Sequence, residues 1–221
     1  MHMTEEERRA RLIKWLEEIY REVQQQRINE FIFWELQKIV NENENFRGAS
    51  GLFTRWMADG FKNSAVIAAR RQIKFDKQAI SLRGLLEEVK KFPELISRTH
   101  YISLFDGKPK QLVAMGQRDF DLVADAGVDC IRLDLVDQQI AELSGSAAKV
   151  KEYADRRVAH YDKREPARPL PTFDDLSAAI KVQERLVIFY RWLLKGANVS
   201  TLLPAIVFDW HDVFKFPWKP E

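Results

Sequence analysis

The chain has little of what disulfide-stabilised, membrane and polycationic proteins require. Its 221 residues include a single cysteine, Cys130, which excludes an intramolecular disulfide and a cysteine-based zinc cluster. The longest apolar run, Leu202 to Phe208, has about seven residues, far fewer than a membrane-spanning helix needs. Lysine and arginine total 35 against 33 acidic residues, so bulk positive charge does not direct this chain to nucleic acid. Together with the polar, acidic N-terminus, these features predict a cytoplasmic protein without a membrane segment.

Sequence patterns of the common nucleotide-binding and hydrolytic folds are also missing. The dinucleotide-binding pattern GxGxxG, the phosphate loop GxxxxGK[ST] and the nucleophile elbow GxSxG do not occur. The four histidines are too far apart in sequence for two of them to share one helical turn as zinc ligands. No metal and no cofactor are therefore predicted.

Apolar residues recur at three- and four-residue spacing along most of the chain. This spacing predicts amphipathic helices, and those after the first 45 residues cover approximately 52–75, 82–89, 94–104, 128–143, 147–162 and 172–195. Alternating strand patterns bounded by turn residues are missing. We therefore predict an all-α fold arranged as a helical bundle.

The first 45 residues are set apart by the positions of the helix breakers. No glycine precedes Gly48 and no proline precedes Pro93, while Gln24, Gln25 and Gln26 interrupt the first apolar stripe. We expect residues 1–45 to form an N-terminal helical arm or hairpin, and residues 46–221 to form the helical bundle domain. Gly107, Pro109 and Gly116 predict an exposed central loop in the second region.

The late segment 153–162 combines groups that metal-free phosphodiester chemistry uses. On a helix, Arg156 lies four residues before His160 and Arg157 three before it, so both guanidinium groups are expected on the face of the imidazole. Histidine moves protons near neutral pH, and arginine holds phosphate oxygens. The predicted catalytic residues are His160, Arg156, Arg157 and Asp155. The predicted substrate-binding residues are Tyr153, Tyr161, Lys163, Arg164, Arg70 and Arg71.

A structural interpretation of the same residues stands beside the functional one. Arginine and histidine near a helix C-terminus are common because cations are favoured at the negative end of the helix dipole. Arg70 and Arg71 can equally pair with Asp76 at the end of a helix. The aromatic C-terminal tail fits a core or a dimer interface better than a surface for stacking bases.

Short stretches of the chain resemble the U-type abortive-infection (AbiU-like) branch of the HEPN domains. The first is 69–76, followed by Ser81–Leu82 and Leu85–Leu86. The second is 153–162, whose Ala-His-x-Asp ending resembles the closing helix of that branch, and Pro217–Trp218 fits as well. The similarity extends over about 61–218.

The resemblance implies an all-α bundle of the HEPN type, a homodimer and a role in bacterial defence or toxin–antitoxin systems. It also implies an antitoxin or defence-system partner, and RNA or nucleotide as the ligand. In active HEPN ribonucleases, two Arg-x(4–6)-His motifs meet across the dimer and cleave RNA without metal. There the 2′-hydroxyl attacks the phosphorus, histidine transfers protons and arginine steadies the phosphate. His160 matches the motif histidine, and Asp155 matches the polar residue near it.

The motif arginine is missing from this chain. The positions that the pattern permits before His160 hold Tyr153, Ala154 and Asp155. Two hypotheses therefore stay open. In the first, a HEPN-like protein binds RNA or nucleotide phosphate around His160 and retains weak metal-independent ribonuclease activity. In the second, the chain is a catalytically silent helical module that dimerises or binds a partner protein.

Overall fold

The computed structural model describes residues 3–42, 51–125, 127–160, 162–164, 168–207 and 209–215. The regular elements that these residues form are helices, with no strand among them, and Ser97 and Cys130 make only an isolated antiparallel bridge. The predicted all-α class is confirmed. Among the described helices, none combines the length and the apolar character needed to cross a lipid bilayer. The α-helices are α1 (Glu5–Glu42), α3 (Gly51–Ile73), α4 (Leu82–Lys91), α5 (Arg98–Ser103), α6 (Lys110–Phe120), α7 (Leu133–Ser146), α8 (Ala148–Tyr153) and α9 (Phe173–Lys195).

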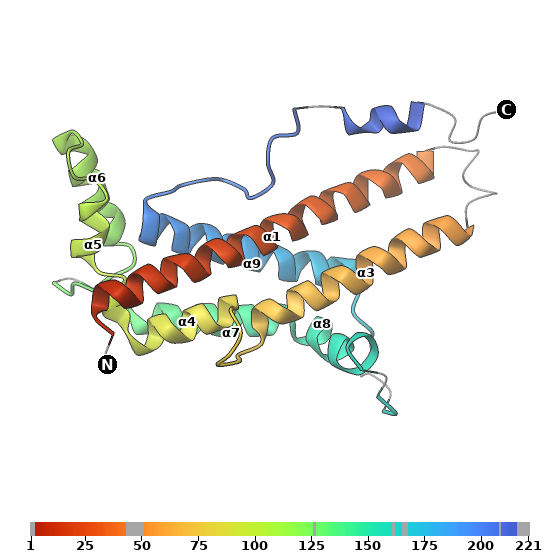
Figure 1. The fold of residues 1–221 in the computed structure, drawn as a ribbon, viewed down its shortest axis with the longest axis horizontal. Coiled ribbons are helices and arrows are strands. Elements are labelled where there is room, and N and C mark those ends of the chain that lie inside the picture. The colour runs from red at the N-terminus through yellow and green to blue at the C-terminus, as the bar shows by residue number, and fades with distance from the viewer. Residues whose placement is uncertain are drawn as a thin grey trace.

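Three long helices, α1, α3 and α9, form the axis of the bundle (Figure 1). Helix α9 runs antiparallel to α1, because Glu17 pairs with Lys195 at the end of α9 while Arg27, later in α1, pairs with Glu184, earlier in α9. Helix α3 is also antiparallel to α1, since the Phe33 and Phe61 rings stack with centroids 4.3 Å apart and Arg71 reaches back to Glu22. Helices α4 and α7 cover one end of this trio, where α5 and α6 project from the bundle (Figure 1).

Two hydrophobic clusters hold the helices together. The larger cluster joins α1, α4, α7 and α9, and the side chains of Leu16, Leu86 and Val187 in it are fully buried. The smaller cluster joins α3, α8 and α9 through the following buried residues: Ala65, Val66, Ala69, Val150, Ala154, Leu176 and Ile180. Its small side chains let α8 approach α3 closely, and this contact places the segment that carries the candidate site.

Residues 5–42 form one continuous helix, not the hairpin that was one of the two expectations for this region. The glutamine run does not interrupt α1, because glutamine is a good helix former. Gln26 is buried on the same face as Val23, and Gln25 donates to the side chain of Asn29 one turn later. Leu12, Leu16, Ile19 and Val23 of α1 belong to the larger cluster. The helix is therefore a component of the bundle core and does not stand apart as an arm.

Helix boundaries agree with the sequence where local capping signals define them. Thr4 and Glu7 make the expected reciprocal bonds before α1, and Ser81 accepts a bond from the Gly84 N–H at the start of α4. Thr172 and Asp175 form a capping box at the start of α9. That helix ends at Gly196, whose positive φ of 64° is the left-handed conformation that glycine adopts without a Cβ clash.

The predicted central loop is wrong, because most of it forms α6. Pro109 occupies the N-cap of this helix, where its missing N–H costs nothing. Gly116 lies inside α6 and is buried against Phe105, whose ring is so close that a Cβ at position 116 would be 2.9 Å from it. The expected helix 94–104 is divided into a 3-10 turn, Pro93–Leu95, and α5, because Ser97 caps a new helix there.

The carboxylate of Glu184 holds the segment that follows α9 against the bundle. Glu184 of α9 accepts bonds of 2.7 Å from the Thr201 hydroxyl and from the Leu202 N–H, and its other oxygen lies 2.8 Å from Arg27 Nε of α1. Gln24 donates to the Leu202 carbonyl, and the Leu202 side chain is only 2% exposed. Residues 197–203 are thus tied to both α1 and α9.

We expect Glu184→Ala to lower the free energy of unfolding by about 2 kcal/mol, because it leaves the Leu202 N–H buried without its acceptor and removes one of the two carboxylates that pair with Arg27, the other being Glu30. Glu142→Ala is the control, since it removes an exposed ion pair with Arg185 and should cost less than about 1 kcal/mol. Urea unfolding followed by circular dichroism measures both. Equal losses would contradict the assigned role of Glu184.

Candidate functional site

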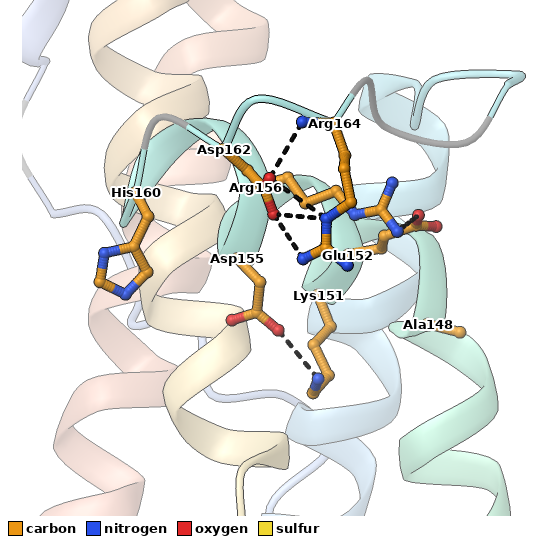
Figure 2. A pocket seen from close by; sticks show the side chains of 8 residues that line it. All are labelled: Ala148, Lys151, Glu152, Asp155, Arg156, His160, Asp162 and Arg164. Carbon is orange, nitrogen blue, oxygen red and sulfur yellow. Dashed lines mark hydrogen bonds and ion pairs between the residues drawn. The ribbon is translucent and has the colours of Figure 1, made fainter.

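A pocket of about 580 Å³ lies along the outer face of α8 and the turn that follows it (Figure 2). It contains the exposed imidazole of His160 together with three cationic and three acidic side chains. The lining residues are Ala148, Lys151, Glu152, Asp155, Arg156, His160, Asp162 and Arg164. Four residues predicted from the sequence, His160, Arg156, Asp155 and Arg164, therefore meet in one pocket.

The backbone here departs from the predicted helix 147–162. Helix α8 ends at Tyr153, and Ala154–Val158 form a π-helical turn in which the Ala159 N–H donates to the Ala154 carbonyl at 2.8 Å. Such turns add one residue to the helical repeat and are frequent at functional sites. Because regular helix has ended before His160, the predicted sharing of one face by Arg156, Arg157 and His160 is not realised. Figure 2 shows the His160 ring on one side of the turn and Arg156 with Arg164 on the other.

Each cationic group in the pocket pairs with a carboxylate of the same pocket. Lys151 Nζ lies 2.9 Å from Asp155, Arg156 lies 3.2 Å from Glu152, and Arg164 lies 2.7 Å from Asp162. Asp162 also accepts the Arg164 backbone N–H, and its own N–H donates to the Arg156 carbonyl at 2.9 Å. The chain after the π turn is therefore folded back over Arg156.

These pairs lower the pKa of two of the acidic groups, Asp162 and Asp155. The side-chain and backbone hydrogen bonds from Arg164 hold the pKa of Asp162 well below its usual value. For Asp155, partial burial opposes ionisation, but the hydrogen bonds from Lys151 and Arg70 outweigh it and lower the pKa. The pocket thus presents fixed charges of both signs at neutral pH.

Arg70 and Arg71 lie at the end of α3 but face different partners. Arg70 Nε bonds to Asp155, so Arg70 does not line the pocket but holds a carboxylate that does. Arg71 lies 2.9 Å from Glu22 of α1 and is directed to another surface, so the structure does not place it at the predicted substrate-binding site. The alternative pairing with Asp76 is not found either, since Lys74 approaches that carboxylate, at 3.7 Å.

The remaining predicted residues divide into three groups. Tyr153 lines a separate pocket on the opposite face of α8. Arg157 is half-buried and Lys163 exposed, and neither lines the pocket of His160. Tyr161 lies outside the described residues.

Sequence reasoning missed Lys151 and Glu152. Both precede a predicted residue by four positions, Asp155 and Arg156 respectively, and opposite charges at that spacing pair on a helix surface. This signal was present in the sequence. By contrast, nothing local indicated that Arg70, far away in sequence, would contact Asp155.

The arrangement is suited to exchanging ionic partners. In the part of the chain that the structure describes, no three histidine, cysteine or acidic side chains gather as metal ligands. An incoming anion can displace a surface carboxylate from a cation at small cost, because exposed ion pairs contribute little free energy. The imidazole of His160 is exposed, so water or a bound molecule can reach its ring nitrogens.

Comparisons with protein-family models, curated proteins and solved structures give no significant match for this chain.

Asp155→Asn should reduce stability by about 0.5–1 kcal/mol near neutral pH, because the variant loses the charge that pairs with Arg70 and Lys151. The folded-state pKa of Asp155 is below its usual value of 3.8, so the contribution of the carboxylate is present above that pH. It is lost as the pH falls through the folded pKa. The difference between wild type and variant in urea unfolding should therefore narrow on acidification.

Asp106→Asn is the control, because it also removes one carboxylate charge, but from an exposed side chain, and it should change stability by less than about 0.5 kcal/mol at neutral pH. A difference between Asp155→Asn and wild type that stays constant down to the acid limit would show that the Asp155 charge does not stabilise the fold.

Proposed function

We propose that this chain is an RNA-binding protein of the HEPN type, acting in bacterial defence or a toxin–antitoxin system, and that the pocket of His160 binds a backbone phosphate. The observation that carries the proposal is the grouping of Lys151, Arg156 and Arg164 around one surface pocket with an exposed imidazole at its rim. Phosphate contacts from lysine and arginine supply most of the affinity in sequence-independent binding of nucleic acids.

Arg164 is the cation best placed to exchange its partner. Its side chain is 76% exposed, and its bonds to Asp162 come from Nε and one terminal nitrogen. A guanidinium carries five N–H donors, so a phosphate can approach the other edge before the carboxylate is released. Arg156 binds phosphate in competition with Glu152, which lies 3.2 Å away.

We propose further that RNA is bound without efficient cleavage. Of the three positions where the motif permits arginine, Tyr153 faces another pocket, Ala154 is fully buried and Asp155 carries the opposite charge. Asp155 brings Arg70 to this place from α3, but an arginine bound to a carboxylate is a weaker partner for a developing negative charge. His160 is the group that would transfer protons if a substrate were aligned.

A second candidate function, a silent module for dimerisation or for binding an antitoxin or defence partner, is favoured by a different observation. Large apolar side chains are exposed where the far ends of α1 and α3 meet, with Leu52 85%, Trp56 70% and Trp34 42% exposed. Aromatic residues are enriched in protein interfaces. A homodimer fits both candidate functions and is the oligomeric state that we propose.

Arg156→Gln should weaken binding of a fluorescein-labelled single-stranded RNA about tenfold at low salt, because one charge-assisted phosphate contact is lost. Arg21→Gln is the matched control, since Arg21 also pairs with a glutamate of its own helix, Glu18, at 2.8 Å, but lies on α1. Fluorescence anisotropy measures both affinities. Equal effects of the two substitutions would contradict a localised phosphate site.

Incubation of labelled RNA with the protein in chelator should leave the RNA intact, and His160→Ala should bind it with unchanged affinity. The reason is that the motif arginine is missing while the phosphate-binding cations are retained. Chelator-resistant products ending in 2′,3′-cyclic phosphate, made by wild type and not by His160→Ala, would contradict the absence of efficient cleavage. If wild type retained no RNA at low salt, the binding proposal would be contradicted. The silent interaction module would then be the remaining candidate function.

A further inference from the structure

A second pocket, of about 260 Å³, lies on the opposite face of α8 from the pocket of His160. Three parts of the chain enclose it: α3, α8 and the connector that leads into α9. Its lining residues are Lys62, Val66, Val150, Tyr153, Leu170, Pro171, Thr172, Phe173 and Leu176. Val150 and Leu176 also belong to the smaller hydrophobic cluster, so the floor of this pocket is the edge of the core.

The polar groups of the second pocket converge on Lys62. Its side chain is 33% exposed, and its ammonium lies 2.5 Å from the more exposed Asp59. The hydrogen bond with Asp59 raises the pKa of Lys62 despite the opposing effect of burial, and the Tyr153 hydroxyl contributes in the same direction. The Thr172 hydroxyl is occupied, because it takes part in the capping box with Asp175. Lys62 is the one charged side chain that lines the described pocket.

We propose that this pocket binds a small aromatic carboxylate, with the ring among Val66, Val150 and Phe173 and the carboxylate on Lys62. An ammonium at the edge of apolar walls attracts an anion more strongly than one in open solvent, because the local dielectric is lower. Asp59 competes for Lys62, but the ammonium has three N–H donors and can contact a second carboxylate, and the ring of the ligand is also buried against the apolar walls.

The RNA proposed for the pocket of His160 would not fit the second pocket, because this pocket is too small and has too few cations. The volume is below the range of about 300–1,000 Å³ that drug-sized ligands occupy, so one or two fused rings fill it. An oligonucleotide needs several cations along its backbone, whereas Lys62 is the single cation among the residues that line this pocket. The inference is therefore independent of the RNA-binding proposal.

The test uses the full chain labelled with ¹³C at its valine and leucine methyl groups, and 2-naphthoate as the probe. The methyl resonances of Val66 and Val150 should shift saturably, while those of Leu12 and Leu16, which lie in the larger cluster, should not. The neutral analogue 2-naphthamide should bind about tenfold more weakly, because it lacks the charge-assisted contact with Lys62. No saturable shift at Val66 and Val150, or shifts spread over both clusters, would overturn the proposal.

Lys62→Met separates the charge from the shape of the pocket, because methionine keeps an apolar stem of similar length. In this variant the ratio of the dissociation constants of 2-naphthamide and 2-naphthoate should fall from about ten to about one. Lys90→Met is the matched control: Lys90 also lies 2.5 Å from an aspartate, Asp137, but on α4, and its replacement should leave the preference unchanged. A preference for the acid that survives Lys62→Met would overturn the assignment of Lys62 as the anion-binding group.

Discussion

Burial of Ala154 between α3 and α9 is the contact on which both pockets depend. Its side chain is fully buried in the smaller cluster, and its carbonyl accepts the bond that closes the π turn. The residue before it, Tyr153, lines the apolar pocket, and the residue after it, Asp155, lines the charged one. A larger side chain at position 154 would push α8 away from α3 and change both pockets together.

The ion pair between Arg70 and Asp155 adds a second tie at the same place. It links the end of α3 to the π turn, and Lys151 joins it from α8. Helix α3, helix α8 and the π turn thus each contribute one side chain to a charged cluster whose side chains are partly exposed. Because positive and negative groups are balanced there, selectivity for the proposed anion would depend on geometry and on the number of charges it carries, and not on a strong positive field.

The sequence predicted those parts of the fold that local chemistry determines. The capping residues Thr4, Ser81 and Thr172 mark helix starts because their side chains satisfy N–H groups in the first turn. The unbroken course of α1 was not predicted, because the burial of Gln26 is a tertiary event. Helix α6 was missed for the same kind of reason, since Gly116 serves there to admit the Phe105 ring.

For the candidate site, residue types were predicted better than geometry. His160, Arg156, Asp155 and Arg164 share a pocket as expected, because they are close in sequence. The π turn after Tyr153 has no local signal, since it follows from the packing of Ala154 on distant helices. It is this turn that separates the imidazole from the guanidinium groups.

The short helix α8 has consequences for how the two faces of this region respond to ligands. Helix α8 has six residues and leads directly into the π turn. Some of its side chains line the apolar cavity, and others line the charged pocket. If a molecule bound on one side displaced α8, the free energy of binding on the other side would change as well. By thermodynamic linkage, that influence is equal in both directions. One short helix lies between two chemically unlike cavities, and it is the element through which any coupling between them would act.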